Sequence, residues 1–89
     1  MFVSWGVETP KKFEMAQLEE KLDMLEDAAR FGAVLRAKGI VAGADGQWIH
    51  FDYVPGEKNV RHGSAGVTGR LCVIGSKLNE AELTALFGV

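Results

Sequence analysis

The chain has 89 residues, of which 47% are hydrophobic and 25% are charged, and its formal net charge at pH 7 is −2. This length predicts one domain with a modest core, and the balanced composition excludes a disordered chain. The slightly acidic charge gives no basic surface for nucleic acid, and no apolar run reaches the roughly 20 residues of a membrane span.

The first patterned segment is residues 2–8, where apolar residues alternate with small or polar ones. A period of two over this length is typical of a half-buried strand, and Pro10 ends it because proline cannot donate to a strand ladder. The strand begins directly after Met1, without a leader or a cap. A fragment cut from a longer protein begins in this way, and we expect the chain to be such a fragment.

Residues 13–30 carry a helical pattern. Apolar side chains recur at intervals of three and four residues, at Leu18, Leu22, Leu25 and Ala29. Such a stripe predicts one amphipathic helix that packs on the domain's own sheet. We expect Glu14 to cap its start and Gly32 to mark its end.

The most strongly patterned stretch is residues 34–54, which predicts two strands joined by the turn Ala44-Asp45-Gly46. The register that this turn sets places Lys38 opposite Asp52, as a cross-strand ion pair, and His50 opposite Ile40. One face is then apolar and should meet the helices: Leu35, Ala37, Gly39, Val41, Ile49, Phe51 and Tyr53. The opposite face, here called the outer hairpin face, consists of Arg36, Lys38, Ile40, Trp48, His50 and Asp52.

The outer hairpin face mixes aromatic, aliphatic and charged side chains, as protein contact surfaces do. It is therefore the candidate interaction face of the chain. The competing interpretation is the solvated side of a sheet, or a face that the C-terminal segment covers.

The last third of the chain predicts four elements. Residues 58–62 are charged, as exposed edge strands are, and residues 64–69 form a loop rich in small residues. Residues 70–75 are almost wholly apolar and predict a central strand. Asn79, with Glu82 three residues later, has the spacing of a capping box and predicts the start of a final helix.

The predicted order is strand, helix, two strands, a short edge strand, a strand and a helix. This order indicates a two-layer α+β fold, with a mostly antiparallel sheet of four to five strands and two helices on one face. Residues 1–89 form one domain, without repeats or an internal boundary.

Little catalytic or metal chemistry is available. The chain has no G-x-x-x-x-G-K-[ST] loop for a nucleotide, and no nucleophile is placed beside His50 and Asp52, so we expect no enzyme activity. The weak metal candidates are His50, His62 and Cys72, which lie on separate predicted strands. We expect Cys72 to be a small buried core residue instead. A single cysteine fits a reducing compartment, so we expect a cytoplasmic protein.

The segments FVSWGVETP, VLRAKGIV, WIHF and RLCVIGSKLNEAELTALF, in this order, resemble the C-terminal domain of CobW-type GTPases. The matching pieces extend from Phe2 to Phe87. Each is weak alone, but their order and spacing together are fairly specific. This family is associated with cobalamin synthesis and metal delivery.

The resemblance implies a non-catalytic accessory domain of a GTP-dependent metallochaperone, which contacts its own GTPase domain, a metal-receiving client protein or another subunit. GTP, Mg²⁺ and a transition metal would belong to the GTPase domain and not to this chain. The alternatives are a stand-alone domain that forms homo-oligomers and, least favoured, a weak metal-binding protein.

Overall fold

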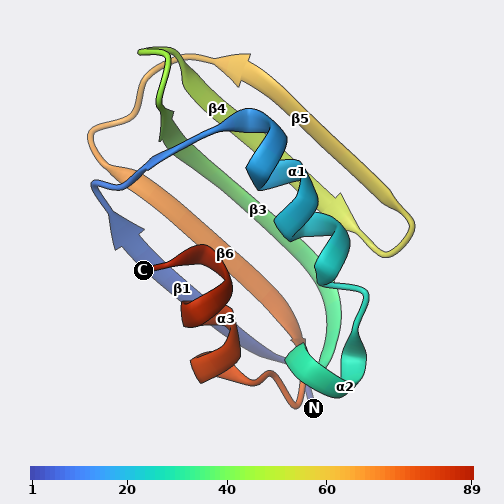
Figure 1. Cartoon of the computed structure of the whole chain (residues 1–89). Coiled ribbons are helices and arrows are strands. Elements are labelled where there is room, and N and C mark those ends of the chain that lie inside the picture. The colour runs from blue at the N-terminus through green and yellow to red at the C-terminus, as the bar shows by residue number, and fades with distance from the viewer.

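Five long strands of the chain form one sheet in the order β1-β6-β3-β4-β5, and every neighbouring pair in this order is antiparallel. The computed structural model describes residues 1–89 (Figure 1). The strands are β1 Val3–Thr9, β2 Lys12–Phe13, β3 Ala33–Gly43, β4 Trp48–Val54, β5 Glu57–Gly63 and β6 Gly69–Ser76. The helices are α1 Met15–Met24, α2 Ala28–Phe31 and α3 Glu80–Phe87. The short β2 pairs with β3 in parallel.

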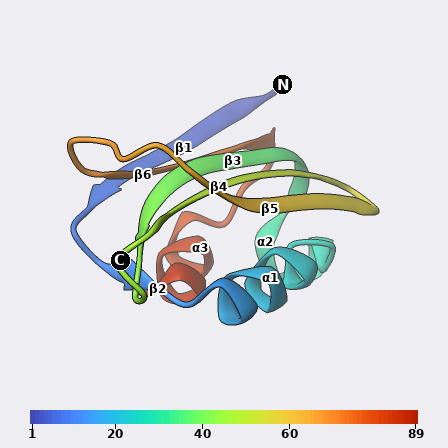
Figure 2. The same ribbon diagram turned by 90° about the horizontal axis from the view of Figure 1, so that it is seen from above.

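All three helices lie on one side of the sheet, as Figure 2 shows. The predicted α+β fold with helices on one face is therefore confirmed, although β2 and α2 add one strand and one helix to the expected set. The core fills the space between the two layers. Its fully buried large side chains come from the helical segments and from the sheet, and include Leu18, Leu22, Phe31, Leu83, Phe87, Val41, Ile49, Phe51, Leu71 and Val73.

The predicted first helix is divided into two. Asp27 accepts a hydrogen bond from the Arg30 N–H at 3.3 Å, and this cap starts α2 as a separate short helix. Leu25 is buried as expected, but Ala29 is exposed because the chain turns before reaching it. Glu14 occupies the N-cap position of α1 without a side-chain cap, whereas Gly32 ends α2 with φ of 87°, as glycine allows.

The register of the β3–β4 hairpin is confirmed. Lys38 lies opposite Asp52 and Ile40 opposite His50, and Gly46 has the positive φ, 87°, that the turn requires. One prediction in the hairpin is wrong, because Leu35 is 43% exposed. The pairing with β6 shifts between Val34 and Arg36, so Val34 takes the buried place instead.

The predicted central strand and final helix are both present. β6 lies between β1 and β3, and α3 begins after Asn79, whose side chain accepts a hydrogen bond from the Glu82 N–H at 3.2 Å. The carboxylate of Glu82 does not close the capping box. It accepts a hydrogen bond of 2.8 Å from Nε of Arg30 and thereby joins α3 to α2.

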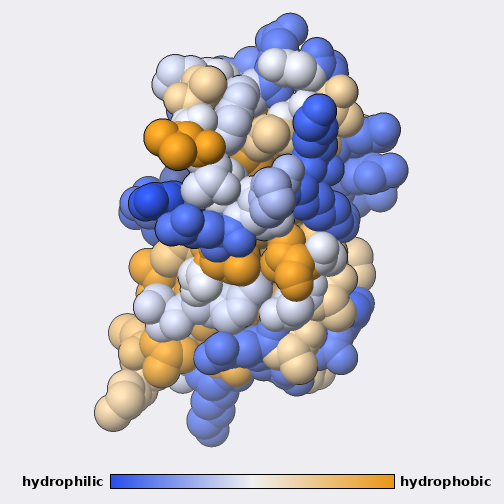
Figure 3. Space-filling view, turned by 90° about the vertical axis from the view of Figure 1, so that its left-hand side faces the viewer, coloured by the Kyte–Doolittle hydropathy of each residue, from blue (hydrophilic) through white to orange (hydrophobic).

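The sheet has two edges of different character. β5 carries the charged segment that sequence patterning assigned to an edge, and it pairs only with β4. Figure 3 looks at the opposite side of the molecule, where hydrophobic residues lie between bands of hydrophilic ones. Phe2, directly before β1, is 66% exposed, and Val3, the first residue of β1, is 43% exposed. Both edges keep backbone groups that no strand pairs.

Candidate functional site

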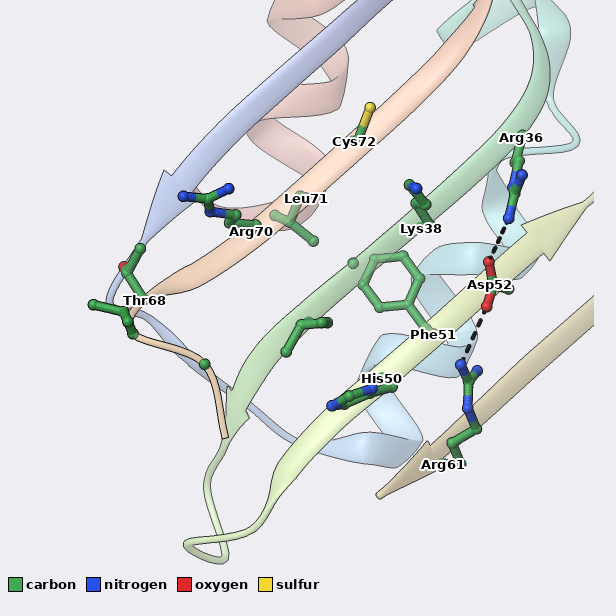
Figure 4. Close-up of a pocket in the computed structure, with 14 residues that line it drawn as sticks. Arg36, Lys38, His50, Phe51, Asp52, Arg61, Thr68, Arg70, Leu71 and Cys72 are labelled. Atoms are coloured by element: carbon green, nitrogen blue, oxygen red, sulfur yellow. Dashed lines mark hydrogen bonds and ion pairs between the residues drawn. The ribbon is translucent and has the colours of Figure 1, made fainter. Parts of the chain in front are cut away.

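The side of the sheet away from the helices carries a hollow of about 650 Å³. Strands β3, β4, β5 and β6 contribute side chains to it, and the loop of residues 64–68 forms part of its wall (Figure 4). This loop joins β5, at one edge, to β6 beyond β3, so it must pass the ends of β4 and β3. The hollow includes most of the outer hairpin face: Arg36, Lys38, Ile40, His50 and Asp52.

Asp52 lies between two arginines. Nη2 of Arg36 donates to Oδ1 at 3.1 Å, and Nη2 of Arg61 donates to Oδ2 at 3.3 Å, as the dashed lines in Figure 4 show. The hydrogen bond from Arg36, together with that from Arg61, holds the pKa of Asp52 below its usual 3.8 despite some loss of hydration. The carboxylate is therefore fixed and ionised at neutral pH.

The predicted Lys38–Asp52 ion pair is wrong, although the two residues are register partners. Both oxygens of Asp52 are occupied by arginines that approach diagonally from β3 and β5. Sequence reasoning missed Arg61 because it lies on the edge strand, and only the β4–β5 register brings it opposite His50. Successive side chains of a strand point to alternate faces, so a strand at residues 58–62 in the right register would have placed Arg61 on the outer face.

Two cations of the hollow are largely unpaired. Lys38 makes no hydrogen bond or ion pair, and its other register neighbour is Cys72 on β6. Arg70 approaches Glu8 only at 3.5 Å, with side chains that are 74% and 64% exposed. Exposed pairs of this length contribute little, so Arg70 remains available to another anion.

His50 contacts the loop of residues 64–68. Its Nε2 lies 2.8 Å from the Ser64 carbonyl oxygen, and its ring lies so close to Gly63 that a Cβ there would be 2.5 Å from it. Asp52 does not contact the imidazole, because it is engaged by Arg36 and Arg61. The arrangement thus holds no oriented His–Asp dyad.

The aromatic and aliphatic members of the face lie against the same loop. A Cβ placed at Gly66 would be 3.4 Å from the Trp48 ring and 3.8 Å from Cγ2 of Ile40. Trp48 is half-buried, Ile40 is 39% exposed and Val67 at the rim is fully exposed. The C-terminal segment does not cover this face, because α3 packs on the other side of the sheet.

The three weak metal candidates are not brought together. His62 lies opposite Ile49 in the register, on the core-facing side, with Nε2 at 3.3 Å from Oδ2 of Asp45, whereas His50 faces the hollow. The expectation that Cys72 is a buried core residue is wrong, since it lines the hollow and is half-buried. No group of three or more His, Cys, Asp or Glu side chains could hold a metal ion. His50 and Cys72 thus line the hollow, whereas His62 lies on the other face of the sheet.

An antiparallel sheet with helices on one face and an open, polar second face defines the class of this chain as a two-layer α+β domain. Residues 2–89 match the family model described as the cobalamin synthesis protein CobW C-terminal domain, and the chain belongs to that family. No helix is both long and apolar enough to cross a membrane.

Two solved structures share the fold. The zinc-bound YjiA GTPase from E. coli is 22% identical over 98% of the chain, with a TM-score of 0.75. A zinc-bound triple mutant of the YjiA GTPase is 20% identical over the same share, with a TM-score of 0.79. The chain spans 29% of the length of each. Among curated proteins, no sequence matches the chain.

Proposed function

We propose that this domain is a non-catalytic accessory module of a CobW-type, GTP-dependent metallochaperone and that it docks through the outer face of its sheet. The observation that carries the proposal is the contrast between the two faces. The helices fill the inner face with core, whereas the outer face leaves Lys38, Ile40 and Arg70 exposed around one hollow. Exposed faces that mix apolar and cationic side chains are typical of interaction surfaces.

The partner would be the GTPase domain of the same protein, a metal-receiving client or another subunit. Family membership and the fold shared with a zinc-bound GTPase support this choice. GTP, Mg²⁺ and the transition metal would bind to the GTPase domain. The work of such a protein would lie in cobalamin synthesis or metal homeostasis, in the cytoplasm.

Substitution of the exposed face tests the proposal. The variants Trp48→Ala and Lys38→Glu are compared with Lys12→Glu, which makes the same charge reversal at an exposed residue of β2, outside the hollow. We expect the first two to weaken binding to a GTPase domain or client by about tenfold or more, and the control to bind normally. Unchanged docking, client binding and self-association in both face variants would refute the assignment.

A second candidate is a domain that associates with itself. The unpaired edge of β1 and the exposed Phe2 and Val3 favour it, because an open strand can pair with another copy. Sedimentation of the isolated chain decides between the two. A monomer supports the accessory module, whereas a dimer that Val3→Lys disperses supports self-association.

A further inference from the structure

The hollow concentrates positive charge on an otherwise acidic chain. Four cationic side chains and one carboxylate line it, namely Arg36, Lys38, Arg61, Arg70 and Asp52. The whole chain has ten Lys and Arg residues and twelve Asp and Glu residues. The remainder therefore has six cationic and eleven anionic side chains, so a local charge of +3 opposes −5 elsewhere. Such an asymmetry attracts an anionic ligand to the outer face.

The free cations lie beside an exposed apolar side chain. Arg70 is the register partner of Ile40 on the neighbouring strand, and Lys38 precedes Ile40 by two residues on the same face of β3. Ile40 is 39% exposed, and Val67, fully exposed, stands at the rim of the hollow. In Figure 4, Lys38 and Arg70 lie on the same side of the sheet, over β3 and β6. The hollow thus offers two charged contacts and one apolar contact within a small area.

Asp52 disfavours a compact polyanion such as phosphate. Phosphate groups are bound best where several donors converge. Here the guanidinium groups of Arg36 and Arg61 already donate to Asp52. A second concentrated negative charge between Arg36 and Arg61 would be repelled by that carboxylate. Carboxylates on a flexible chain can instead reach Lys38 and Arg70 separately.

We infer that the hollow binds an acidic peptide segment of a partner protein, with carboxylates at Lys38 and Arg70 and an apolar side chain against Ile40 and Val67. The volume of about 650 Å³ lies within the usual range of ligand sites. The inference rests on the proposed function only for the existence of a partner, and it adds the chemistry of the segment that the partner presents.

The test is a titration of the isotope-labelled chain, followed by its amide NMR resonances, with a synthetic peptide of glutamate and leucine residues. Three further probes are an analogue with glutamine in place of glutamate, inorganic phosphate, and the first peptide at high salt. We expect the acidic peptide to shift resonances of Lys38, Ile40 and Arg70. The glutamine analogue should bind about tenfold more weakly than the acidic peptide. The affinity of the acidic peptide should also fall at high salt, because salt screens the charges.

Variants place the binding on this face. Lys38→Glu and Arg70→Glu should each weaken binding of the acidic peptide by about tenfold, whereas Lys12→Glu should leave it unchanged. Three results would overturn the inference: no binding of the acidic peptide, shifts confined to other surfaces, or equal shifts from phosphate alone. If Trp48→Ala abolishes docking to a partner while the acidic peptide does not bind, the docking face stands and only its ligand chemistry fails.

Discussion

The two faces of the β3–β4 hairpin use neighbouring residues for opposite purposes. Phe51 and His50 are adjacent in β4, yet Phe51 is 2% exposed in the core while His50 faces the hollow and contacts Ser64. The inner face is stabilised by burial of apolar area. The outer face is held by exposed ion pairs, which contribute little to folding. The inner face therefore stabilises the fold, whereas the outer face contributes little to stability and remains exposed.

The largest expected loss of stability comes from a substitution on the inner face. Phe51→Ala removes a fully buried ring and should lower the free energy of unfolding by about 3–5 kcal/mol, enough to unfold much of a domain of this size. His50→Ala, one residue away, should cost about 1 kcal/mol or less, because it removes one hydrogen bond. Urea denaturation of both variants measures the difference. Equal losses would contradict the division of the hairpin into two faces.

A smaller effect is expected where β3 passes under the Phe51 ring. A Cβ at Gly39 would lie 2.5 Å from the Phe51 ring and 2.5 Å from the Arg70 carbonyl oxygen. Gly39→Ala should therefore destabilise the domain by about 1–3 kcal/mol. Gly6→Ala is the matched control, since its Cβ would meet nothing closer than 3.7 Å. Thermal unfolding measures the two variants. An equal fall of Tm in both would show that the close contacts at Gly39 are not the cause.

Tyr53 has a buried hydroxyl without a hydrogen-bond partner. Burial, reinforced by the charges of Glu26 and Asp23, raises the pKa of Tyr53 above 10.0. The folded chain then holds this proton more tightly than the unfolded chain, so stability is lost as pH rises past the unfolded value. Tyr53→Phe should be neutral or stabilising by up to about 1 kcal/mol, because it removes an unpaired polar group.

Denaturation between about pH 8 and pH 11 checks the sign, because the unfolded tyrosine titrates near pH 10. The parent chain should lose stability over this range more steeply than Tyr53→Phe. A strong destabilisation of the variant at neutral pH would mean that the hydroxyl has a partner.

The smallest effect on stability is expected at Asp52. Its arginine partners are exposed, so Asp52→Asn should cost about 0.5 kcal/mol or less near neutral pH. The pKa of Asp52 in the folded chain lies below 3.8. The contribution of its ion pairs to stability is therefore present at neutral pH and is lost only as the pH falls through that folded pKa. The same change removes the one carboxylate of the hollow and should strengthen binding of the acidic peptide. Weaker binding in calorimetry would indicate that Asp52 itself contacts the ligand.

Much of the inner face could be predicted from the sequence because its signals are local. Alternation in residues 34–54, the turn at Gly46 and the Asn79 cap each depend on neighbours along the chain, and all three are present. Departures arise where distant elements intervene. Leu35 is displaced by the irregular pairing with β6, and Glu82 is drawn from its own cap to Arg30.

The hollow could be predicted only in part. Register within the hairpin places Arg36, Lys38 and Asp52 on one face, but which cation pairs with Asp52 depends on Arg61 from β5. Cys72 was misplaced because an almost wholly apolar strand suggests burial on both sides, whereas this sheet has helices on one side only. Sequence patterning does not report which face remains uncovered.

Alkylation of Cys72 tests the division of faces most directly. It is the single cysteine of the chain and lines the hollow, so its reaction with iodoacetamide reports on access to the outer face. The control is Cys72→Ser combined with Glu20→Cys, which places a thiol on the exposed side of α1. The alkylation rates of the parent chain and of the control are measured alone and in complex with a GTPase domain or client that sediments with the chain. The bound partner should lower the alkylation rate of Cys72 by about tenfold or more, because a docked surface excludes the reagent. The alkylation rate of the control thiol should stay unchanged. An unchanged rate at Cys72, in a complex that sedimentation shows to be formed, would contradict docking through this face.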